Sequence, residues 1–242
     1  MKVLIDGNNL VYRYFYIKPD IENYTINCFN RLIDRIKENY FINEKDIIFV
    51  FDDFNLQNPR RTIYPEYKNN RAKKNPLLKE QLKKLMEMTR CKTLKSNKLE
   101  ADDIIATLCK VNSQKKKPER IIVMSNDKDL YSIIDNNVSI VRDLKFNEIM
   151  NKETFEKMYK IPTEKWVYVK GLKGDDSDNI PGVKGIGEKT ALSITKKERD
   201  FKAICNHVFL KYGEKGLNDF KIAYSLVTPI IDIETVKNIY NV

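Results

Sequence analysis

Three short apolar runs occur along the chain, and each of them ends in aspartate. The runs are residues 2–5, 46–51 and 121–124, and the acids that follow them are Asp6, Asp52, Asp53, Asp127 and Asp129. Apolar runs of this length without polar alternation are typical of strands buried on both faces of a parallel sheet. Ligands bind such sheets beyond the carboxyl ends of the strands. One aspartate there is usually structural, but its repetition predicts that the acids converge on one site.

Helical periodicity fills the segments between and after these runs, because apolar residues recur there at spacings of three and four. The expected helices lie within residues 10–36, 77–86, 152–160, 166–172 and 188–194. Alternation of apolar runs and helices indicates an α/β protein. We therefore expect an α/β core at residues 1–165 and a helical subdomain at residues 166–242.

A further group of acids begins the helix predicted after residue 99, in the sequence LEADDIIATL. Glu100, Asp102 and Asp103 precede apolar residues that supply a buried face. Acids in the first turn of a helix stabilise it through the helix dipole, so a capping role is one reading. Three acids exceed what a cap requires, and we take them as additional metal-ligand candidates.

Residues 171–190, GLKGDDSDNIPGVKGIGEKT, combine an acidic cluster with a glycine-punctuated turn. Asp175, Asp176 and Asp178 offer oxygen ligands of the kind that Mg²⁺ and Mn²⁺ prefer. The glycines that follow permit close backbone approach, and a helix N-terminus after such a turn can present N–H groups to phosphate. A glycine-rich turn alone is more often an ordinary loop, but the two features in tandem favour cleavage of a phosphodiester.

The balance of charge points to a polyanionic partner. The 242 residues carry a formal net charge of +10 and a sequence pI near 9.2, which favours nucleic acid, although a merely basic soluble protein is the alternative. The four cysteines form no C-x-x-C pair, and His207 is the only histidine, which argues against structural zinc and histidine-dependent catalysis. We see no secretory signal or membrane-spanning run and expect a soluble, cytoplasmic protein.

Much of the positive charge lies between the second and third apolar runs. The basic residues there are Arg60, Arg61, Lys68, Arg71, Lys73, Lys74, Lys79, Lys83 and Lys84. A solvated charged face is the usual explanation of such a run. Tyr64 and Tyr67 are interleaved with the first of these cations, however, and this combination favours phosphate binding and base stacking.

Taken together, the acids predict a site for divalent metal ions. Carboxylates packed closely without cations repel one another and take up protons. Two ions about 4 Å apart can activate water and stabilise the leaving oxygen at phosphorus, with no need for histidine or cysteine. Lys68 and Arg71 would then neutralise charge on the phosphate in the transition state.

Six segments in a fixed order resemble the 5′-nuclease family, which includes phage 5′-exonucleases, the 5′-nuclease domain of bacterial DNA polymerase I and the flap endonucleases. The segments are DGNNLVYR from Asp6, VFDD from Val50, YPEYKNNR from Tyr64, EADD from Glu100, SNDKDL from Ser125 and GLKGDDSDNIPGVKGIGEKTA from Gly171. The resemblance implies a PIN-like central sheet flanked by helices, a helical arch over about 73–98, and a helix–three-turn–helix DNA-binding motif at about 180–195.

The resemblance also implies roles for individual residues. The implied ligands of the first metal are Asp6, Asp52, Glu100, Asp102, Asp103 and Asp127, and those of the second are Asp129, Asp175 and Asp178, with Asp127 near both. The implied catalytic residues are Lys68, Arg71, Asp6, Asp52, Asp103 and Asp127. The implied DNA contacts are Arg13, Arg60, Tyr67, Lys73, Lys74, Val183, Lys184, Gly185, Gly187, Lys189 and Thr190. Asp52 is preferred to its neighbour Asp53, and Asp176 lies at a variable position.

From this resemblance we expect a structure-specific 5′-nuclease that depends on Mg²⁺, or on Mn²⁺ in its place, with K⁺ at the helix–three-turn–helix motif. Its substrates would be DNA with a 5′ flap or free 5′ end, or an RNA primer on DNA, during replication or repair in a bacterium or a phage-infected cell. A monomer that assists a DNA polymerase is expected. The alternatives are a PIN-type ribonuclease, which would lack the GVKGIGEKTA segment, and a non-catalytic DNA-junction binder, which would tolerate loss of the acids.

Overall fold

A six-stranded sheet forms the centre of the molecule, with the strand order β3-β2-β1-β4-β5-β6. The structure is a computed structural model that describes residues 1–17, 24–71, 75–143 and 145–240. The strands are β1 (Lys2–Asp6), β2 (Ile47–Asp52), β3 (Lys92–Ser96), β4 (Ile121–Met124), β5 (Val138–Val141) and β6 (Ile149–Met150). The first five are parallel, and β6 pairs with β5 in antiparallel orientation. The three strands predicted from apolar runs are therefore confirmed, as the middle of the sheet.

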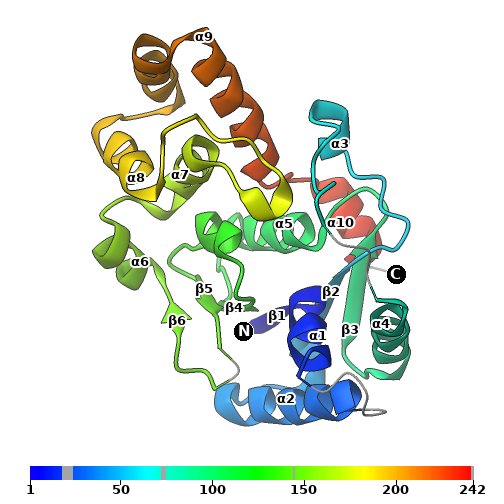
Figure 1. Cartoon of the computed structure of the whole chain (residues 1–242). Helices are drawn as coiled ribbons and strands as arrows, with labels where there is room; N and C mark the ends of the chain where they lie inside the picture. Colours follow the sequence, from blue (N-terminus) through cyan, green and yellow to red (C-terminus); the bar gives the residue numbers. More distant parts are fainter. Residues whose placement is uncertain (18–23, 72–74, 144, 241–242) are drawn as a thin grey trace.

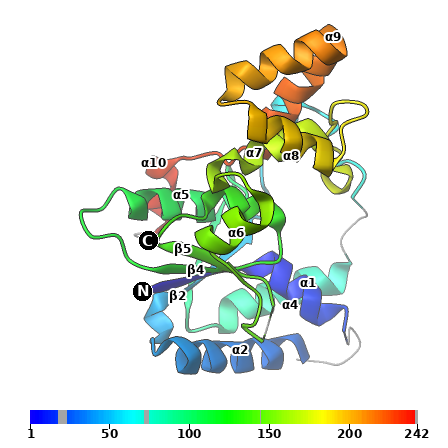
Figure 2. The ribbon, with the colours of Figure 1, turned by 90° about the vertical axis from the view of Figure 1, so that its left-hand side faces the viewer.

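Helices cover both faces of the sheet, which explains why its central strands are apolar at successive positions (Figures 1 and 2). Val3 and Ile5 point to one face and pack with α1, α2 and α4, whereas Leu4 points to the other and packs with α5, α6 and α10. The bounds of these helices are α1 (Gly7–Phe15), α2 (Tyr24–Tyr40), α4 (Pro76–Met88), α5 (Ala101–Ser113), α6 (Lys152–Tyr159) and α10 (Ile233–Tyr240). The predicted α/β fold is thus confirmed.

The register of the central strands places their terminal acids at one edge. Ile5 of β1 pairs with Phe49 of β2 and with Met124 of β4, so the three strands end nearly level. Asp6 and Asp52 are the last residues of their strands, and Asp127 follows β4 after two residues. Because the strands are parallel, all three carboxylates emerge at the same edge of the sheet.

A group of helices extends away from the sheet beyond α6 (Figure 2). Its members are α7 (Trp166–Lys173), α8 (Glu188–Lys197) and α9 (Phe201–Val227), and α9 is interrupted at Gly213, whose φ is 71°. Short 3₁₀ helices occur at Glu44–Asp46, Lys128–Ile133, Thr163–Lys165 and Asp176–Asp178. We call α7 to α9 the helical subdomain. After α9 the chain returns to the core, where α10 packs on α5 and β3.

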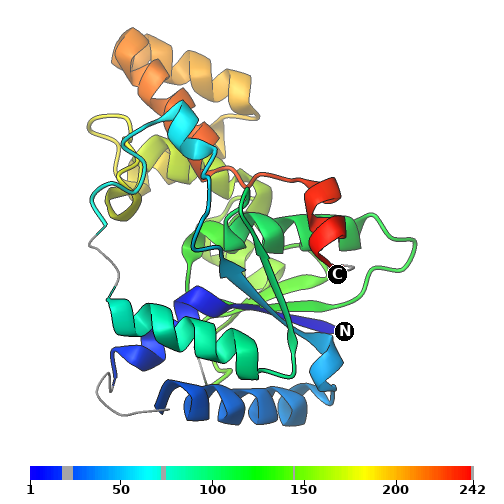
Figure 3. The same ribbon diagram turned by 90° about the vertical axis from the view of Figure 1, so that its right-hand side faces the viewer.

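The segment predicted to form an arch over about 73–98 belongs in large part to the core. Leu78 and Leu82 on α4 are buried against α1 and α2, and residues 92–96 form the edge strand β3. The sequence KTLKS of β3 is polar because only one of its faces packs on helices. Lys73 and Lys74 lie outside the described residues. The chain before them, with α3 (Arg60–Ile63), runs beside α9 (Figure 3).

Within the described ranges, no helix combines the length and the apolar content that crossing a membrane requires.

The turn between α7 and α8 is packed too closely for a side chain at Gly182. A Cβ atom there would lie 2.0 Å from the Lys173 carbonyl oxygen, whereas Gly187 at the start of α8 faces open space. We expect Gly182→Ala to lower the free energy of unfolding by about 1–3 kcal/mol, the usual cost of overpacking. Gly187→Ser should stay within about 0.5 kcal/mol, because serine is favoured as an N-cap. Urea unfolding of both variants checks this, and equal stabilities would contradict the packing described.

Candidate active site

A cavity of about 380 Å³ opens at the carboxyl edge of the sheet, between the starts of α1 and α5 and the segment that follows α3. Most of the predicted metal ligands line it. Its charged lining residues are Asp6, Arg13, Asp52, Lys68, Arg71, Glu100, Asp102, Asp127 and Asp178. The acids thus converge from β1, β2, β4, the start of α5 and the turn after α7, as the sequence pattern predicted for three of these segments.

Hydrogen bonds fix the acids at the strand ends. Asp6 caps α1 by accepting from the Asn9 backbone N–H at 3.0 Å, and its second oxygen accepts from Ser125 Oγ at 2.9 Å. Asp52 accepts from Asn8 Nδ2 and from the Ala101 N–H, both at 2.9 Å. Each carboxylate is therefore held in one orientation toward the cavity.

Asp52 and Asp53, neighbours at the end of β2, line different hollows. Asp52 lines the acid cavity, whereas Asp53 pairs with Lys95 of β3 at 3.5 Å and lines a separate hollow. Successive side chains of a strand point to opposite sides, and the end of β2 follows that rule. The geometry agrees with the choice of Asp52.

The buried acids repel one another. Burial, together with the nearby charges of Asp52 and Asp127, raises the pKa of Asp6 to about 7 despite the hydrogen bonds from Asn9 and Ser125. Burial and the charges of Asp127 and Asp6 likewise raise the pKa of Asp102 well above its usual range. These shifts mark a place where a bound cation would relieve a conflict between carboxylates.

Lys68 and Arg71 line the same cavity as the acids. Lys68 contacts Glu100 and lies 3.5 Å from Asp178, and Arg71 pairs with Asp178 through Nε at 3.1 Å. Burial raises the pKa of Glu100, but the charges of Lys68 and Arg60 outweigh it and hold that pKa below its usual value. The two predicted catalytic cations are therefore beside the predicted ligands.

Two of the three acids predicted for a second metal, Asp129 and Asp175, lie against a cation that the sequence prediction did not include. Lys170 of α7 is only 8% exposed, and its Nζ lies 2.6 Å from Asp129 and 2.5 Å from Asp175. Although burial raises the pKa of Asp175, hydrogen bonds from Lys170 and Ser177 lower it to about 2. A signal was available, because Lys170 interrupts the otherwise apolar run WVYVKGL.

Three predicted site residues are buried and paired with other protein groups. Arg60 is 4% exposed and binds Asp103 through both terminal nitrogens at 2.7 Å, and Asp103 is fully buried. Tyr67 is 3% exposed and donates its hydroxyl to Glu100 at 3.0 Å. None of the three is among the residues that line the acid cavity, and their predicted roles in DNA contact, metal ligation and catalysis stay predictions. Each is satisfied inside the protein.

The remaining predicted DNA contacts lie on two surfaces. Arg13 lines the acid cavity and donates to the Arg142 carbonyl at 3.0 Å. The turn before α8 and the first turn of that helix expose the backbone or side chains of several predicted residues: Lys184, Gly185, Gly187, Lys189 and, in part, Thr190. Gly185 has a φ of 86°, which favours glycine. The Val183 side chain is buried in the core, so that residue could offer only its backbone.

The donor chemistry of the cavity fits a hard divalent cation, since every acid contributes oxygen. Among the described residues no three His, Cys, Asp or Glu side chains already form a ligand set. Lys68, Arg71 and Lys170 instead neutralise the acids nearest to them. Asp6, Asp52, Glu100, Asp102 and Asp127 would hold one cation, and Asp127, Asp129, Asp175 and Asp178 another.

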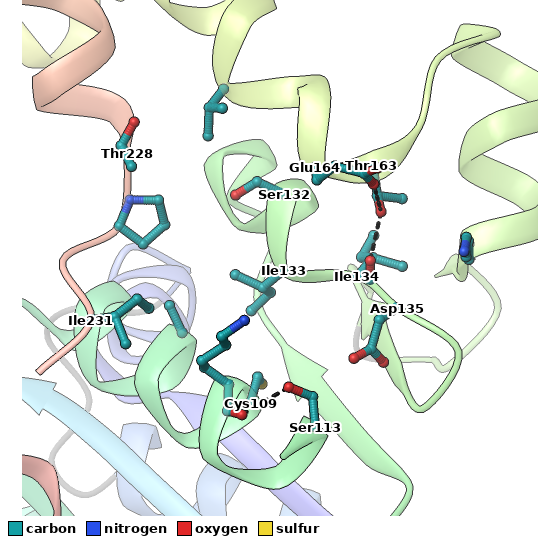
Figure 4. A pocket seen from close by; sticks show the side chains of 15 residues that line it. Cys109, Ser113, Ser132, Ile133, Ile134, Asp135, Thr163, Glu164, Thr228 and Ile231 are labelled. Atoms are coloured by element: carbon teal, nitrogen blue, oxygen red, sulfur yellow. Dashed lines mark hydrogen bonds between the residues drawn. The ribbon is translucent and has the colours of Figure 1, made fainter. Parts of the chain in front are cut away.

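A second cavity, also about 380 Å³, is lined by α5, residues 132–135 and the chain after α9 (Figure 4). It is mostly apolar, and Asp135 and Glu164 are its only acids among the lining residues. Without clustered carboxylates it does not match the predicted chemistry, and the acid cavity remains the candidate active site.

Two family models together match nearly the whole chain. One, described as 5′-3′ exonuclease, N-terminal resolvase-like domain, matches residues 1–160, and the other, 5′-3′ exonuclease, C-terminal SAM fold, matches residues 161–239. The chain belongs to the 5′-3′ exonuclease family. The resemblance inferred from the sequence motifs is confirmed, and with it the assignment as a nuclease.

Named relatives agree with this family. The 5′-3′ exonuclease of Buchnera aphidicola subsp. Schizaphis graminum is 34% identical, over 85% of this chain and 73% of that protein. DNA polymerase I of Bacillus subtilis is 32% identical over 90% of this chain, a match that spans 26% of the polymerase.

Solved structures agree in fold. The T5 5′-exonuclease with divalent metal ions (zinc) bound has a TM-score of 0.74 at 21% identity, covering 98% of this chain and 89% of that one. A bacteriophage T5 flap endonuclease in a pseudo-enzyme-product complex with DNA and metal ions has a TM-score of 0.71 at 21% identity, covering 93% and 85%.

The position of Lys170 between two acids of this exonuclease-family site gives a prediction about metal removal. In Lys170→Met the acids lose their counter-charge, and we expect the free energy of unfolding in EDTA to fall by about 2–3 kcal/mol, less than for a fully buried pair. Adding Mg²⁺ should recover much of that loss. Lys173→Met is the matched control, because Lys173 lies on the same helix and is 43% exposed. Denaturant unfolding with and without Mg²⁺ measures both, and a Lys170→Met protein as stable as the control in EDTA would contradict the assignment.

Proposed function

We propose that this exonuclease-family chain is a structure-specific 5′-nuclease that hydrolyses DNA phosphodiester bonds near junctions between single strand and duplex. The observation that carries the proposal is the acid cavity, in which carboxylates from five segments face Lys68 and Arg71. A cavity lined by both carboxylates and cations suits a phosphodiester held between metal ions and positive side chains. Mg²⁺ is the proposed physiological ion, with Mn²⁺ as a substitute.

The bound ions would supply an activated water and stabilise the leaving oxygen. Lys68 and Arg71 would then bind the phosphate of the substrate. Lys68 and Arg71 pair with Glu100 and Asp178 in the present structure, and a phosphate entering the cavity would offer them a competing anion. Arg71 is 49% exposed, so it can turn toward a phosphate at little cost. Asp6 and Asp52 keep their orientation because Ser125, Asn8 and backbone N–H groups hold them.

The duplex is proposed to bind along the turn before α8. Lys184 in that turn and Lys189 at the start of α8 are exposed, and the N-terminus of the ten-residue α8 can present backbone N–H groups to a phosphate. The same turn is the proposed position of a K⁺ ion. Contacts of this kind read no base sequence and weaken with salt. The T5 relative solved with DNA and metal ions supports DNA as the substrate.

The proposed role is removal of 5′ flaps or RNA primers during DNA replication or repair, by a monomer in the cytoplasm of a bacterium or a phage-infected cell. The Bacillus subtilis relative, named DNA polymerase I, supports an association with a polymerase.

The test is cleavage of a 5′-labelled flap duplex in Mg²⁺, in EDTA, and in Mg²⁺ with Asp175→Ala/Asp178→Ala. We expect cutting near the junction that EDTA abolishes. The double variant should be slower by about a hundredfold or more, the effect typical of losing transition-state charge stabilisation. Labelled products on a sequencing gel give both the position and the rate of cleavage.

Asp176→Ala is the matched control, because Asp176 lies between the two mutated residues and its side chain is exposed. It should retain cleavage within a few-fold of the unmodified chain. Tight binding of the flap without cutting in either Mg²⁺ or Mn²⁺ would overturn the nuclease proposal and favour a junction-binding protein. Preferential cutting of single-stranded RNA would favour a ribonuclease.

A further inference from the structure

Two buried side chains join the end of α9 to the acid cavity. Arg60 donates from Nε to the Leu226 carbonyl at 2.7 Å and from Nη2 to the Thr228 carbonyl at 3.2 Å. Its Nη1 lies 3.0 Å from Glu100 Oε2, and its two terminal nitrogens bind Asp103. One guanidinium therefore holds the last turn of α9 and the acids that begin α5.

Asp103 completes this junction. Its oxygens accept hydrogen bonds from both terminal nitrogens of Arg60. They also accept from the Glu100 backbone N–H at 3.2 Å and the Ile230 backbone N–H at 2.8 Å. Asp103 and Arg60 are thus bound to the same stretch, residues 226–230, which links α9 to α10. A buried carboxylate with this many partners fixes the relative positions of the segments it joins.

Tyr67 provides a second connection to Glu100. Its ring packs in an apolar cluster with Leu226 and Val227 at the end of α9, and its hydroxyl donates to Glu100 Oε2 at 3.0 Å. The next residue, Lys68, contacts the other Glu100 oxygen. A shift of the end of α9 would therefore change the surroundings of both oxygens.

The stretch that links α9 to α10 is not tightly packed on its other side. Thr228, Pro229 and Ile231 border the second cavity, and Figure 4 shows Thr228 and Ile231 on its rim. A segment that borders a cavity can shift with less loss of packing than one inside a close-packed core. The polar contacts to Arg60 and Asp103 therefore determine much of its position.

We propose that Arg60, Tyr67 and Asp103 are positioning residues that couple the placement of the helical subdomain to the placement of Glu100 in the acid cavity. This inference rests on the proposed function, in which the turn before α8 binds duplex while the acid cavity cuts. Duplex held by the subdomain would settle α9, and the junction would then set Glu100 and Lys68 for catalysis. The three residues touch neither substrate nor metal.

The coupling predicts a dependence on duplex length that a purely structural role would not alter. Two flap substrates are compared, one with a duplex long enough to reach α8 and one too short to do so. The unmodified chain should cut the longer one faster under single-turnover conditions with enzyme saturating. In Tyr67→Phe, which keeps the ring and removes the hydroxyl, this advantage should fall by about tenfold, as expected from slight misplacement of a catalytic group. Arg60→Lys should act in the same direction.

The controls are neighbours in the same segment. Tyr64→Phe alters a partly buried tyrosine beside the same apolar cluster, and Arg61→Lys alters an exposed arginine. Both should keep the length advantage of the unmodified chain. Affinity for the longer duplex, measured by fluorescence anisotropy with Ca²⁺, should change less than threefold in Tyr67→Phe. That result separates positioning from binding.

The outcomes distinguish the two proposals. The coupling would be overturned if Tyr67→Phe cut the longer duplex as much faster than the shorter one as the unmodified chain does. It would also be overturned if the unmodified chain cut both at the same rate. Either result would leave the nuclease proposal intact. Equal slowing of both substrates would also overturn the coupling, since that is the result of general destabilisation. No cutting of either flap by the unmodified chain would overturn the proposed function and the coupling with it.

Discussion

The structure depends on neutralising carboxylates that the sheet forces together. Parallel strands must deliver their ends to one edge, so Asp6, Asp52 and Asp127 cannot avoid one another once β1, β2 and β4 are adjacent. The raised pKa of Asp6, at about 7, expresses the cost of that arrangement. Cations from other segments pair with acids beside these three, and the pair between Lys170 of α7 and Asp129 connects the helical subdomain to the segment after β4.

Much of this arrangement was readable from the sequence, because it follows from local patterns. The central strands were predicted from unbroken apolar runs, and the acids at their ends from the rule for parallel sheets. The edge strand β3 was missed, since KTLKS lacks such a run and only its position beside β2 makes it a strand. The same limit explains why the range predicted for the arch includes β3.

Side-chain pairing was not readable in the same way. Arg60 and Arg71 are basic residues of one segment, and nothing in their local sequence separates a buried arginine from a half-exposed one. The difference arises because the end of α9 packs against Arg60. The Leu226 carbonyl, 166 residues further along the chain, accepts a hydrogen bond from the Arg60 side chain. Lys170 was overlooked for a related reason, because its value as a counter-charge depends on Asp129, which lies on a distant segment.

The burial of these cations divides them into two kinds. Breaking a buried, hydrogen-bonded pair leaves an uncompensated charge in a medium of low polarity, whereas an exposed pair is exchanged for water at little cost. The Arg60 side chain is 5% exposed and the Arg71 side chain 49%, so the first acts as a fixed part of the fold and the second is free to trade partners. Lys68 and Lys170, at 19% and 10%, fall between them and border the places where metal or phosphate would enter. In a site built in this way, Arg60 holds Glu100 and Asp103 in place. The more exposed cations can exchange their carboxylate partners for a ligand.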